Sequence, residues 1–377
     1  MSRISTTRFT VLVLLLLVPA LLFAGMPSGN SYKVLTPITS GNLTVFPVAA
    51  SHTHDTSRFL TLDEGVRAGS VVVTESGNAQ GLVRGPHPVR PVRGDQVNKL
   101  VLINNSNRPL LLLAGEIVTG GKQDRVIGED RIIPVNSGPV DLSVFCVEPG
   151  RWTQKTATFG YMNSQMAAPS IRRPAVAAKS QQEVWDNVRK SNAAVTEQVR
   201  AEAAAGGIPL QSRSVAGLAN TTSYAQVMDN RAVKTKIADV AAPMERNYDA
   251  MFRELRKQNA VGVVAAINGR IIWADVFAST ELLQDYWPKL IRSYAAEAVT
   301  TVARGGAVDA NAAQAYINNL AGTREVSETD PGVYRRSEIT GDSYRVFSLV
   351  SLLPSTDYTV HLAKMDTDPT FKARYIE

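Results

Sequence analysis

The stretch from Leu110 to Trp152 reads LLLLAGEIVTGGKQDRVIGEDRIIPVNSGPVDLSVFCVEPGRW and holds the strongest fold signals of the chain. An apolar run opens it, and a Gly-Gly step surrounded by charged and amide side chains follows. A second strand-like run, Val140–Val147, leads into another polar group. Short apolar runs bounded by glycine, asparagine or proline are typical of β-strands joined by turns. The stretch therefore predicts buried strands next to either a binding pocket or an unusually polar turn.

The same pattern extends over residues 32–160. Further apolar runs lie at Leu43–Val48, Gly69–Thr74 and Lys99–Asn104. Their short length and regular turn signals favour an antiparallel, sandwich-like unit over βαβ repeats. Three prolines within residues 84–93 indicate an extended surface loop. We therefore predict a β-rich unit at residues 32–160 that contains the central polar motif.

The middle of the chain has helical signals. Residues 161–180 have the alanine, proline and serine content of a linker. Residues 181–259 are predicted to form a helical segment. Its first part, Gln181–Ala205, contains neither glycine nor proline and is rich in strong helix formers.

Two further signals lie within residues 260–365, the predicted third unit. The step Asn268-Gly269 separates two β-rich runs, which predicts a tight hairpin. Apolar residues at helical spacing, beginning with Trp287, predict a helix over Glu281–Val302. Together the patterns predict an α+β protein. It has an N-terminal antiparallel β-rich, sandwich-like unit followed by helices packed on a small antiparallel sheet.

The N-terminus has the layout of a secretory signal peptide. Arg3 and Arg8 form a basic start, residues 11–23 are apolar apart from one proline, and Ala24 supplies a small residue for cleavage. We expect residues 1–24 to be removed and the remainder to be exported, periplasmic or extracellular, and outside the membrane. The alternative is that the segment is kept as an anchor. Recovery of the chain from membranes with an intact N-terminus would contradict removal.

The composition of the chain limits the classes of partner and cofactor that it can bind. The 377-residue chain carries a formal net charge of +6, an excess too small to indicate a nucleic-acid partner. One cysteine, Cys146, excludes an internal disulfide framework, and its apolar surroundings favour a buried, inert thiol. The pair His52 and His54 is not a complete ligand set, so we predict neither a metal nor another cofactor.

The Gly-Gly step is the centre of the candidate site. Its spacing is not that of a phosphate loop, but backbone amides at such a turn can bind an anion with Lys122 and Arg125. Glu116 could form an acid–base pair with Asp124 or Glu148 if the fold brings them together. The alternative is an ion-paired polar turn. The candidate catalytic residues are Glu116 and Glu148, and the candidate ligand-binding residues are Lys122, Gln123, Asp124, Arg125, Arg151 and Trp152.

These motifs resemble a known family. GEIVTGGKQDRVI (Gly115–Ile127) and CVEPGRW (Cys146–Trp152) resemble the ARG and Rhodanese-Phosphatase-superfamily-associated protein domain. The weaker strings NLTVFPV (Asn42–Val48) and GRIIWADVF (Gly269–Phe277) agree with it, and the resemblance spans residues 32–365. The family's association with ADP-ribosylglycohydrolase and phosphatase-like domains implies a role near ADP-ribose or related phosphorylated ligands. We find no glycohydrolase or phosphatase motif in these residues, and the predicted export departs from that setting.

Two functional hypotheses follow. In the first, the protein is an exported module that recognises a small anionic, nucleotide- or sugar-phosphate-like ligand. Lys122 and Arg125 would contact the anion, Gln123 would donate a hydrogen bond, and Glu116 or Glu148 would orient the ligand or act as acid–base. In the second, the protein is a structural or protein-interaction domain of the cell envelope, and these residues form a closed polar network. Whether the protein is an enzyme stays open.

Overall fold

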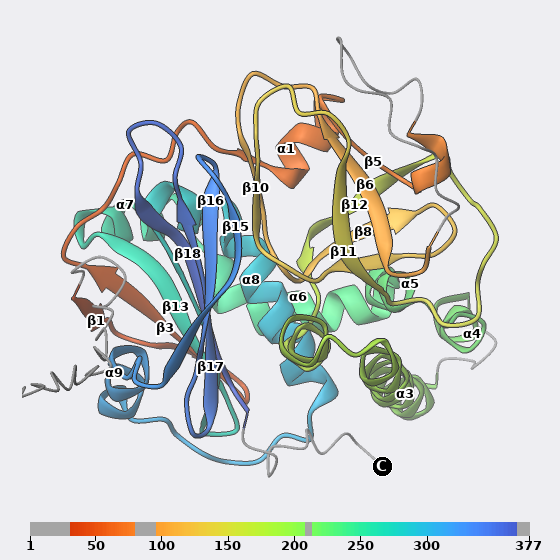
Figure 1. Cartoon of the computed structure of the whole chain (residues 1–377). Helices are drawn as coiled ribbons and strands as arrows, with labels where there is room; N and C mark the ends of the chain where they lie inside the picture. Colours follow the sequence, from red (N-terminus) through yellow and green to blue (C-terminus); the bar gives the residue numbers. More distant parts are fainter. Residues whose placement is uncertain (1–30, 80–95, 208–212, 368–377) are drawn as a thin grey trace, which may run out of the picture.

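Two β-structures stand side by side in the molecule, with helices between and beneath them (Figure 1). The computed structural model describes residues 31–79, 96–207 and 213–367. It confirms the predicted α+β class: antiparallel strands dominate the N-terminal half, and helices precede a second antiparallel sheet in the C-terminal half. The proline-rich loop at residues 84–93 and the predicted signal peptide lie outside the described residues.

The larger β-structure is an antiparallel sheet of nine strands. Its order is β1-β3-β13-β14-β18-β17-β16-β15, with β2 also paired to β3. The strands are β1 (Tyr32–Val34), β2 (Ile38–Ser40), β3 (Leu43–Ala50), β13 (Ala260–Ile267), β14 (Arg270–Phe277), β15 (Thr323–Asp330), β16 (Tyr334–Thr340), β17 (Tyr344–Ser351) and β18 (Tyr358–Asp366). Nearly all of β3 is buried. This burial agrees with the position of β3 inside the sheet, where it pairs with β13, a strand far along the chain, and not with the strands that follow it.

The smaller β-structure is a closed barrel with strand order β11-β6-β5-β12-β8-β9. Its strands are β5 (Val71–Thr74), β6 (Lys99–Asn104), β8 (Glu116–Gly120), β9 (Arg125–Ile127), β11 (Val140–Cys146) and β12 (Thr158–Met166). A separate three-stranded sheet contains β4 (Leu60–Thr61), β7 (Leu110–Leu112) and β10 (Arg131–Ile133). The β-rich unit that the sequence indicated thus closes on itself, which removes exposed strand edges.

The described helices lie mainly around the barrel and between the two β-structures (Figure 1). They are α1 (Leu62–Arg67), α2 (Pro169–Arg173), α3 (Gln181–Ala205), α4 (Arg213–Ala219), α5 (Tyr224–Asp229), α6 (Arg231–Glu245), α7 (Tyr248–Lys257), α8 (Thr280–Thr300) and α9 (Ala310–Asn318). A 3-10 turn covers Ser76–Asn78, and a π-helical turn, Pro174–Ala178, follows α2. Residues 161–180, expected to be a linker, contain the end of β12, α2 and this turn, and much of the segment is buried.

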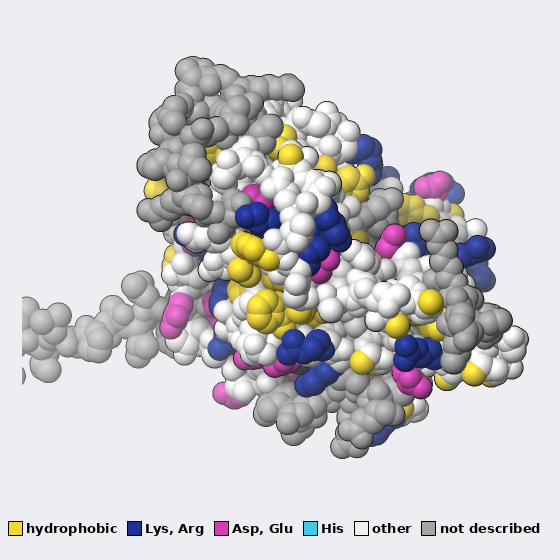
Figure 2. Space-filling view, turned by 90° about the vertical axis from the view of Figure 1, so that its right-hand side faces the viewer, with side chains coloured by type: hydrophobic (Ala, Val, Ile, Leu, Met, Phe, Trp, Pro, Cys, Tyr) yellow, Lys and Arg dark blue, Asp and Glu magenta, His cyan; other side chains and the backbone are white. Residues whose placement is uncertain are grey.

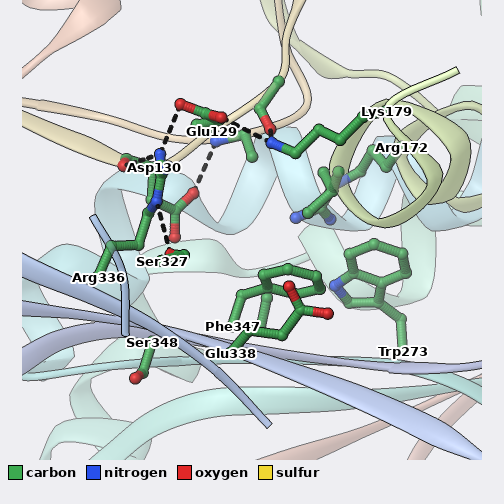
Figure 3. Close-up of a pocket in the computed structure, with 14 residues that line it drawn as sticks. Glu129, Asp130, Arg172, Lys179, Trp273, Ser327, Arg336, Glu338, Phe347 and Ser348 are labelled. Carbon is green, nitrogen blue, oxygen red and sulfur yellow. Dashed lines mark hydrogen bonds and ion pairs between the residues drawn. The ribbon is translucent and has the colours of Figure 1, made fainter. Parts of the chain in front are cut away.

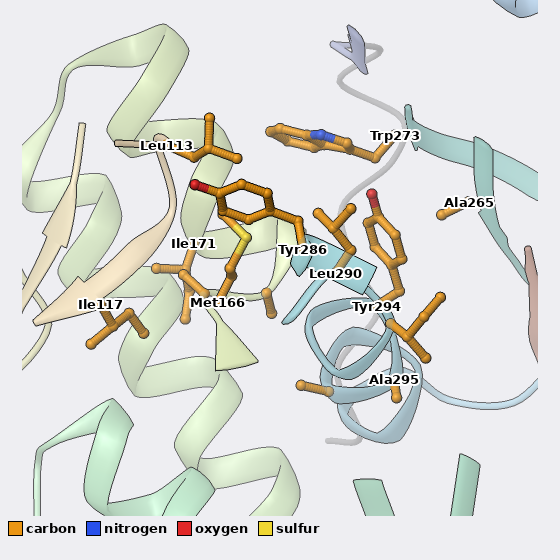
Figure 4. Packing of buried hydrophobic residues seen from close by; sticks show 14 of the residues in the cluster. Leu113, Ile117, Met166, Ile171, Ala265, Trp273, Tyr286, Leu290, Tyr294 and Ala295 are labelled. Atoms are coloured by element: carbon orange, nitrogen blue, oxygen red, sulfur yellow. The ribbon is translucent and has the colours of Figure 1, made fainter. Parts of the chain in front are cut away.

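Helix α8 is the central element of the core. Ser279 caps it by accepting a hydrogen bond from Leu282 N (3.1 Å), and most of its side chains are buried, as expected for a helix with protein on all sides. In Figure 4, Tyr286 and Tyr294 of α8 lie among residues from both β-structures. The helix predicted over Glu281–Val302 is therefore confirmed to within two residues at each end.

The predicted hairpin is confirmed as well. Strands β13 and β14 pair on either side of Asn268 and Gly269, whose φ angles are 52° and 76°. Positive φ at both central residues is the requirement of a type I′ turn, which asparagine and glycine meet with little strain. The local sequence thus determines this turn without help from the rest of the fold.

Basic and acidic side chains are interspersed over the described part of the face shown in Figure 2. Among the described residues no helix is both long and apolar enough to cross a membrane. The same part of the chain has no group of three or more His, Cys, Asp or Glu residues placed to hold a metal ion. Cys146 is fully buried, as predicted, and burial raises the pKa of its thiol.

Candidate functional site

The Gly-Gly step forms the tight turn between β8 and β9. Gly120 and Gly121 have φ angles of 116° and 48°, a conformation that side chains with a Cβ rarely adopt. A Cβ on Gly121 would also collide with the ring of Phe159. The two glycines therefore allow the chain to reverse tightly and to place Lys122, Gln123 and Asp124 at one end of the barrel.

The loop after β11 packs against this turn. Val147 N donates to Asp124 O (3.0 Å). Arg151 donates from Nη1 to Gly121 O (2.9 Å) and from Nη2 to Gly120 O (3.2 Å). Two sequence motifs about 30 residues apart thus form one group at the barrel end. We call this group the barrel-end cluster: Lys122, Gln123, Asp124, Arg125, Glu148, Arg151 and Trp152.

Both carboxylates of the cluster are held by neighbours. Glu148 Oε2 lies 2.5 Å from Arg151 Nη2, and Lys155 Nζ lies 3.3 Å from Oε1. Burial alone would raise the pKa of Glu148, but the hydrogen bond and charge of Arg151 outweigh it and lower that pKa. Asp124 accepts from Gly120 N (2.9 Å) and from Ser223 Oγ (2.6 Å), and burial raises its pKa. These two acids are therefore largely closed to a ligand.

Arg125 differs from the other charged residues of the cluster. It is fully buried, and its Nε donates to Val97 O (2.9 Å). Its terminal nitrogens, Nη1 and Nη2, are buried without an acceptor among the described residues. Burial lowers the pKa of the guanidinium. Natural proteins rarely leave such donors unsatisfied, and an unseen ion or water is one usual explanation.

Trp152 lies next to this guanidinium. The Arg125 guanidinium carbon is 5.8 Å from the Trp152 ring centroid, and Lys122 Nζ is 5.2 Å from it. The indole is 44% exposed, so it stands between the buried arginine and solvent. Two other buried atoms of the cluster, Arg151 Nε and Gln123 Oε1, also lack partners within the described part of the chain.

Glu116 does not join the barrel-end cluster. It begins β8, four residues before Gly120, which is about 13 Å along a strand. Its carboxylate is buried, accepts from Leu113 N (2.8 Å) and pairs with Lys289 of α8. Lys289 Nζ also lies 2.7 Å from Asp63 Oδ1. The structure therefore brings together seven of the eight sequence-derived candidates, but it separates Glu116 from Glu148.

An open groove borders the cluster at Asp124 and is also lined by the neighbouring residues Gly120 and Lys155. It has a volume of about 860 Å³ and lies between the barrel and helices α5, α6 and α8. Its lining carries four basic side chains, Lys155, Arg231, Lys234 and Arg292, and two acidic ones, Asp124 and Asp229. Lys155, Lys234 and Arg292 pair with Glu148, Asp229 and Glu245, so the basic excess is small and favours an anionic occupant only weakly.

A second, smaller cavity of about 230 Å³ lies between the β9–β10 loop and the nine-stranded sheet (Figure 3). Trp273 and Phe347 form its aromatic side. Across it, Glu129 joins two cations: Lys179 Nζ lies 2.7 Å from Oε1 and Arg336 Nη1 2.7 Å from Oε2. Against the effect of burial, Arg336 and Lys179 lower the pKa of Glu129 to about 2.

A buried charge network lies behind this cavity. Arg172 donates to both carboxylate oxygens of Asp275 (3.0 and 3.1 Å), and Tyr294 Oη donates to the same carboxylate. His361 lies between two acids: Nδ1 is 2.6 Å from Asp130 Oδ2, and Nε2 is 3.3 Å from Asp275 Oδ1. Against burial, Arg172 and His361 hold the pKa of Asp275 well below its ordinary value. The network connects the β9–β10 loop with the nine-stranded sheet, α2 and α8.

The network predicts a pH-dependent stability. Burial opposes the charged imidazole, but Asp130 and Asp275 outweigh it and raise the pKa of His361 to about 9, from about 6.5 in the unfolded chain. Because the pKa of His361 is higher in the folded state, its charged imidazole stabilises the fold fully below about pH 6.5. This stabilisation is lost as pH rises through about 9. We expect the free energy of unfolding to fall by on the order of 3 kcal/mol over this range.

Urea unfolding across this pH range measures the effect. Arg172 and Tyr294 also face the network, so the comparison is with the His361→Gln variant, which keeps those groups and removes the imidazole. At each pH the free energy of unfolding is measured for both proteins. The part of its pH dependence that only wild type shows is the contribution of His361. Equal pH profiles for the two proteins would contradict the prediction.

No sequence motif identified this network. Asp275 lies 103 residues from Arg172, and Asp130 lies 231 residues from His361. No local motif contains both partners of either contact. The only available signal was the position of Asp275 and His361 within apolar strands, where a charged residue needs a partner.

Comparison with known proteins gives the family. Neither the curated proteins nor the solved structures contain a significant match to this chain. A family model described as the ARG and Rhodanese-Phosphatase-superfamily-associated Protein domain matches residues 31–365. That span includes the barrel, the helices and the nine-stranded sheet, and the chain therefore belongs to this family.

Proposed function

We propose that this protein binds a small anionic ligand at the barrel-end cluster. The observation that carries the proposal is the unsatisfied guanidinium of Arg125, whose Nη1 and Nη2 are buried without acceptors in the described structure. Arg151 Nε, in the same cluster, is a third such donor. Phosphate and carboxylate groups offer only acceptors at neutral pH and pair with guanidinium through two parallel hydrogen bonds.

The free-energy cost of burying the Arg125 guanidinium supports an anion at this position. Burial opposes the charge of Arg125 more strongly than the nearby acids Glu75 and Asp124 favour it, and a bound ion of opposite sign can offset that cost. Lys122, beside Trp152, adds a second positive charge close to Arg125. The indole would have to move aside to admit the anion, and its partial exposure leaves room for that movement.

The groove beside the cluster supports an organic ligand larger than the anion alone. Its volume of about 860 Å³ lies within the usual range for small-molecule sites, about 300–1,000 Å³. Nucleotides and sugar phosphates, including ADP-ribose-like molecules, combine an anionic group with a body of this size. The family's association with a phosphatase superfamily agrees with a phosphorylated ligand. The basic, apolar and small residues of the N-terminus support export of this module.

The proposal is one of binding rather than catalysis. Glu148 is paired through both oxygens, to Arg151 and Lys155. Glu116 is about 13 Å along β8 from the cluster and is paired with Lys289. Two acids that face different partners do not form the acid–base pair that the sequence allowed.

The variant Arg125→Met tests this function. We expect wild type to be stabilised by inorganic phosphate, pyrophosphate or ADP, by about 2.7 kcal/mol when the ligand is at 100 times its Kd. Arg125→Met should lose this response, because the donors to the anion are gone. Without ligand, its stability should not fall by more than about 1 kcal/mol, because the loss of the hydrogen bond to Val97 and of the contact with Trp152 is offset by removal of an uncompensated buried charge. Thermal shift and urea unfolding measure the two quantities.

The exposed residue Arg253 on α7 supplies the control. Arg253→Met removes the same charge away from the cluster and should keep the full response to ligand. The proposal fails if none of the three anions stabilises wild type, or if Arg125→Met responds as Arg253→Met does.

The structural or protein-interaction role in the cell envelope is the second candidate. The mutual pairing of Asp124, Glu148 and Arg151 favours it, because closed ion-pair networks are common structural elements. In that case Arg125 would serve the fold. Its replacement by Met would then lower the free energy of unfolding by several kcal/mol in the absence of any ligand.

A further inference from the structure

The cavity between the barrel and the nine-stranded sheet has walls of both charge signs (Figure 3). Three basic and three acidic side chains line it: Arg172, Lys179 and Arg336, with Glu129, Asp130 and Glu338. This balance separates it from the groove beside the barrel-end cluster, where basic groups are in excess. An occupant with both a positive and a negative group would match these walls.

The partners of each charge show which groups remain available to a ligand. Asp130 is held by His361 and by Ala114 N (2.7 Å), and Glu129 by Lys179 and Arg336. Within the described part of the chain, Glu338 forms one ion pair, with Arg345 at 3.2 Å. Glu338 pairs with Phe347 across β16 and β17, and in Figure 3 its carboxylate lies beside the ring of Phe347. Glu338 is therefore the acid best placed to receive a cationic group from a ligand.

Lys179 offers the complementary charge. Its ammonium donates to Gly128 O (3.3 Å) and to Glu129 Oε1 (2.7 Å), and an ammonium has three donors. The third can bind a carboxylate that enters the cavity. Arg336 lies on the other side of Glu129 in Figure 3 and adds a second positive charge, which also pairs with Glu328.

Size and polarity restrict the occupant further. A volume of about 230 Å³ corresponds to roughly eight water molecules at ~30 Å³ each. This is too small for a nucleotide. Trp273, Phe347 and Val176 add an apolar wall, which favours an apolar portion in the ligand.

We propose that this cavity binds a free amino acid with an apolar side chain. The ligand ammonium pairs with Glu338, its carboxylate with Lys179 and Arg336, and its side chain packs on Trp273 and Phe347. The proposal is independent of anion binding at the barrel-end cluster, because no residue of that cluster lines the cavity.

Isothermal titration of the full chain with L-leucine tests the proposal. Two analogues separate the charges: isoamylamine lacks the carboxylate, and 4-methylpentanoate lacks the ammonium. We expect leucine to bind at least tenfold more tightly than either analogue, because only the zwitterion pairs with both walls. Absence of leucine binding, or equal affinity for leucine and one analogue, would overturn the proposal.

A variant assigns the binding to this cavity. Glu338→Gln should weaken leucine binding at least tenfold and leave the affinity for 4-methylpentanoate unchanged. The matched control is Glu197→Gln, on an exposed position of α3, which should bind leucine as wild type does. Unchanged leucine affinity in Glu338→Gln would refute the assignment. If Glu338→Gln does not fold, the wild-type comparison of leucine with its analogues still decides.

Discussion

Replacing Asp275 with Asn is expected to lower the free energy of unfolding by about 3–5 kcal/mol. The Asp275 carboxylate is fully buried and accepts hydrogen bonds from Arg172, Tyr294 and Trp273. Asparagine has nearly the same shape, so packing is kept, but the guanidinium of Arg172 loses its counter-charge. Breaking a buried pair by removing one partner is costly because a buried charge is left uncompensated. Urea unfolding at neutral pH measures the loss.

Asp186→Asn is the matched control for this experiment. Asp186 pairs with Arg189 on the surface of α3, where the two side chains are 43% and 55% exposed. Surface pairs of this kind contribute about 0–1 kcal/mol, so the control should lose little. A similar small loss in Asp275→Asn would show that the Arg172–Asp275 contact does not stabilise the junction between α2 and the sheet.

Replacing Lys289 with Met should cost a similar amount, about 3–5 kcal/mol at neutral pH. Lys289 of α8 is the shared cation of Glu116 on the barrel and Asp63 on α1. Burial opposes its charge, but the two carboxylates outweigh burial and raise the pKa of its ammonium. Methionine fills comparable space and leaves the buried Glu116 and the half-buried Asp63 without this cation.

The pH dependence of this loss gives a second readout. Burial already raises the pKa of Glu116, and removal of Lys289 removes a charge that opposes that shift. As pH falls, Glu116 takes up a proton and the uncompensated charge disappears, so the deficit of Lys289→Met should shrink. Lys234→Met, which removes an exposed pair with Asp229, should show neither the loss nor the pH dependence. A deficit that does not change with pH would contradict the role given to Glu116.

Local elements of the fold could be predicted because their causes lie in a few adjacent residues. The Asn268-Gly269 turn needs only two residues that tolerate positive φ. Helix α8 has apolar side chains at helical spacing and a serine cap. The closure of the β-rich unit into a barrel had no local cause. It depends on pairing of β12 with both β5 and β8.

Most of the barrel-end cluster could also be predicted, since β8, β9 and β11 are sequence neighbours that pair directly. Their connecting turns therefore meet at one end of the barrel. Glu116 shares the same stretch of sequence, but it begins β8 while the cluster lies at its end. Strand length, rather than sequence proximity, separates it from the cluster.

The sequence by itself indicated the α+β class, the Asn268-Gly269 hairpin and the long helices, and it located the polar turn at Gly120 and Gly121. Only the tertiary structure decided which charges meet. Arg172 finds Asp275 and His361 finds Asp130 across separations of 103 and 231 residues. The physical reason is that apolar periodicity specifies which face of an element is buried. It does not specify which other buried face will lie against it, and a buried charge is paired only once that packing is complete.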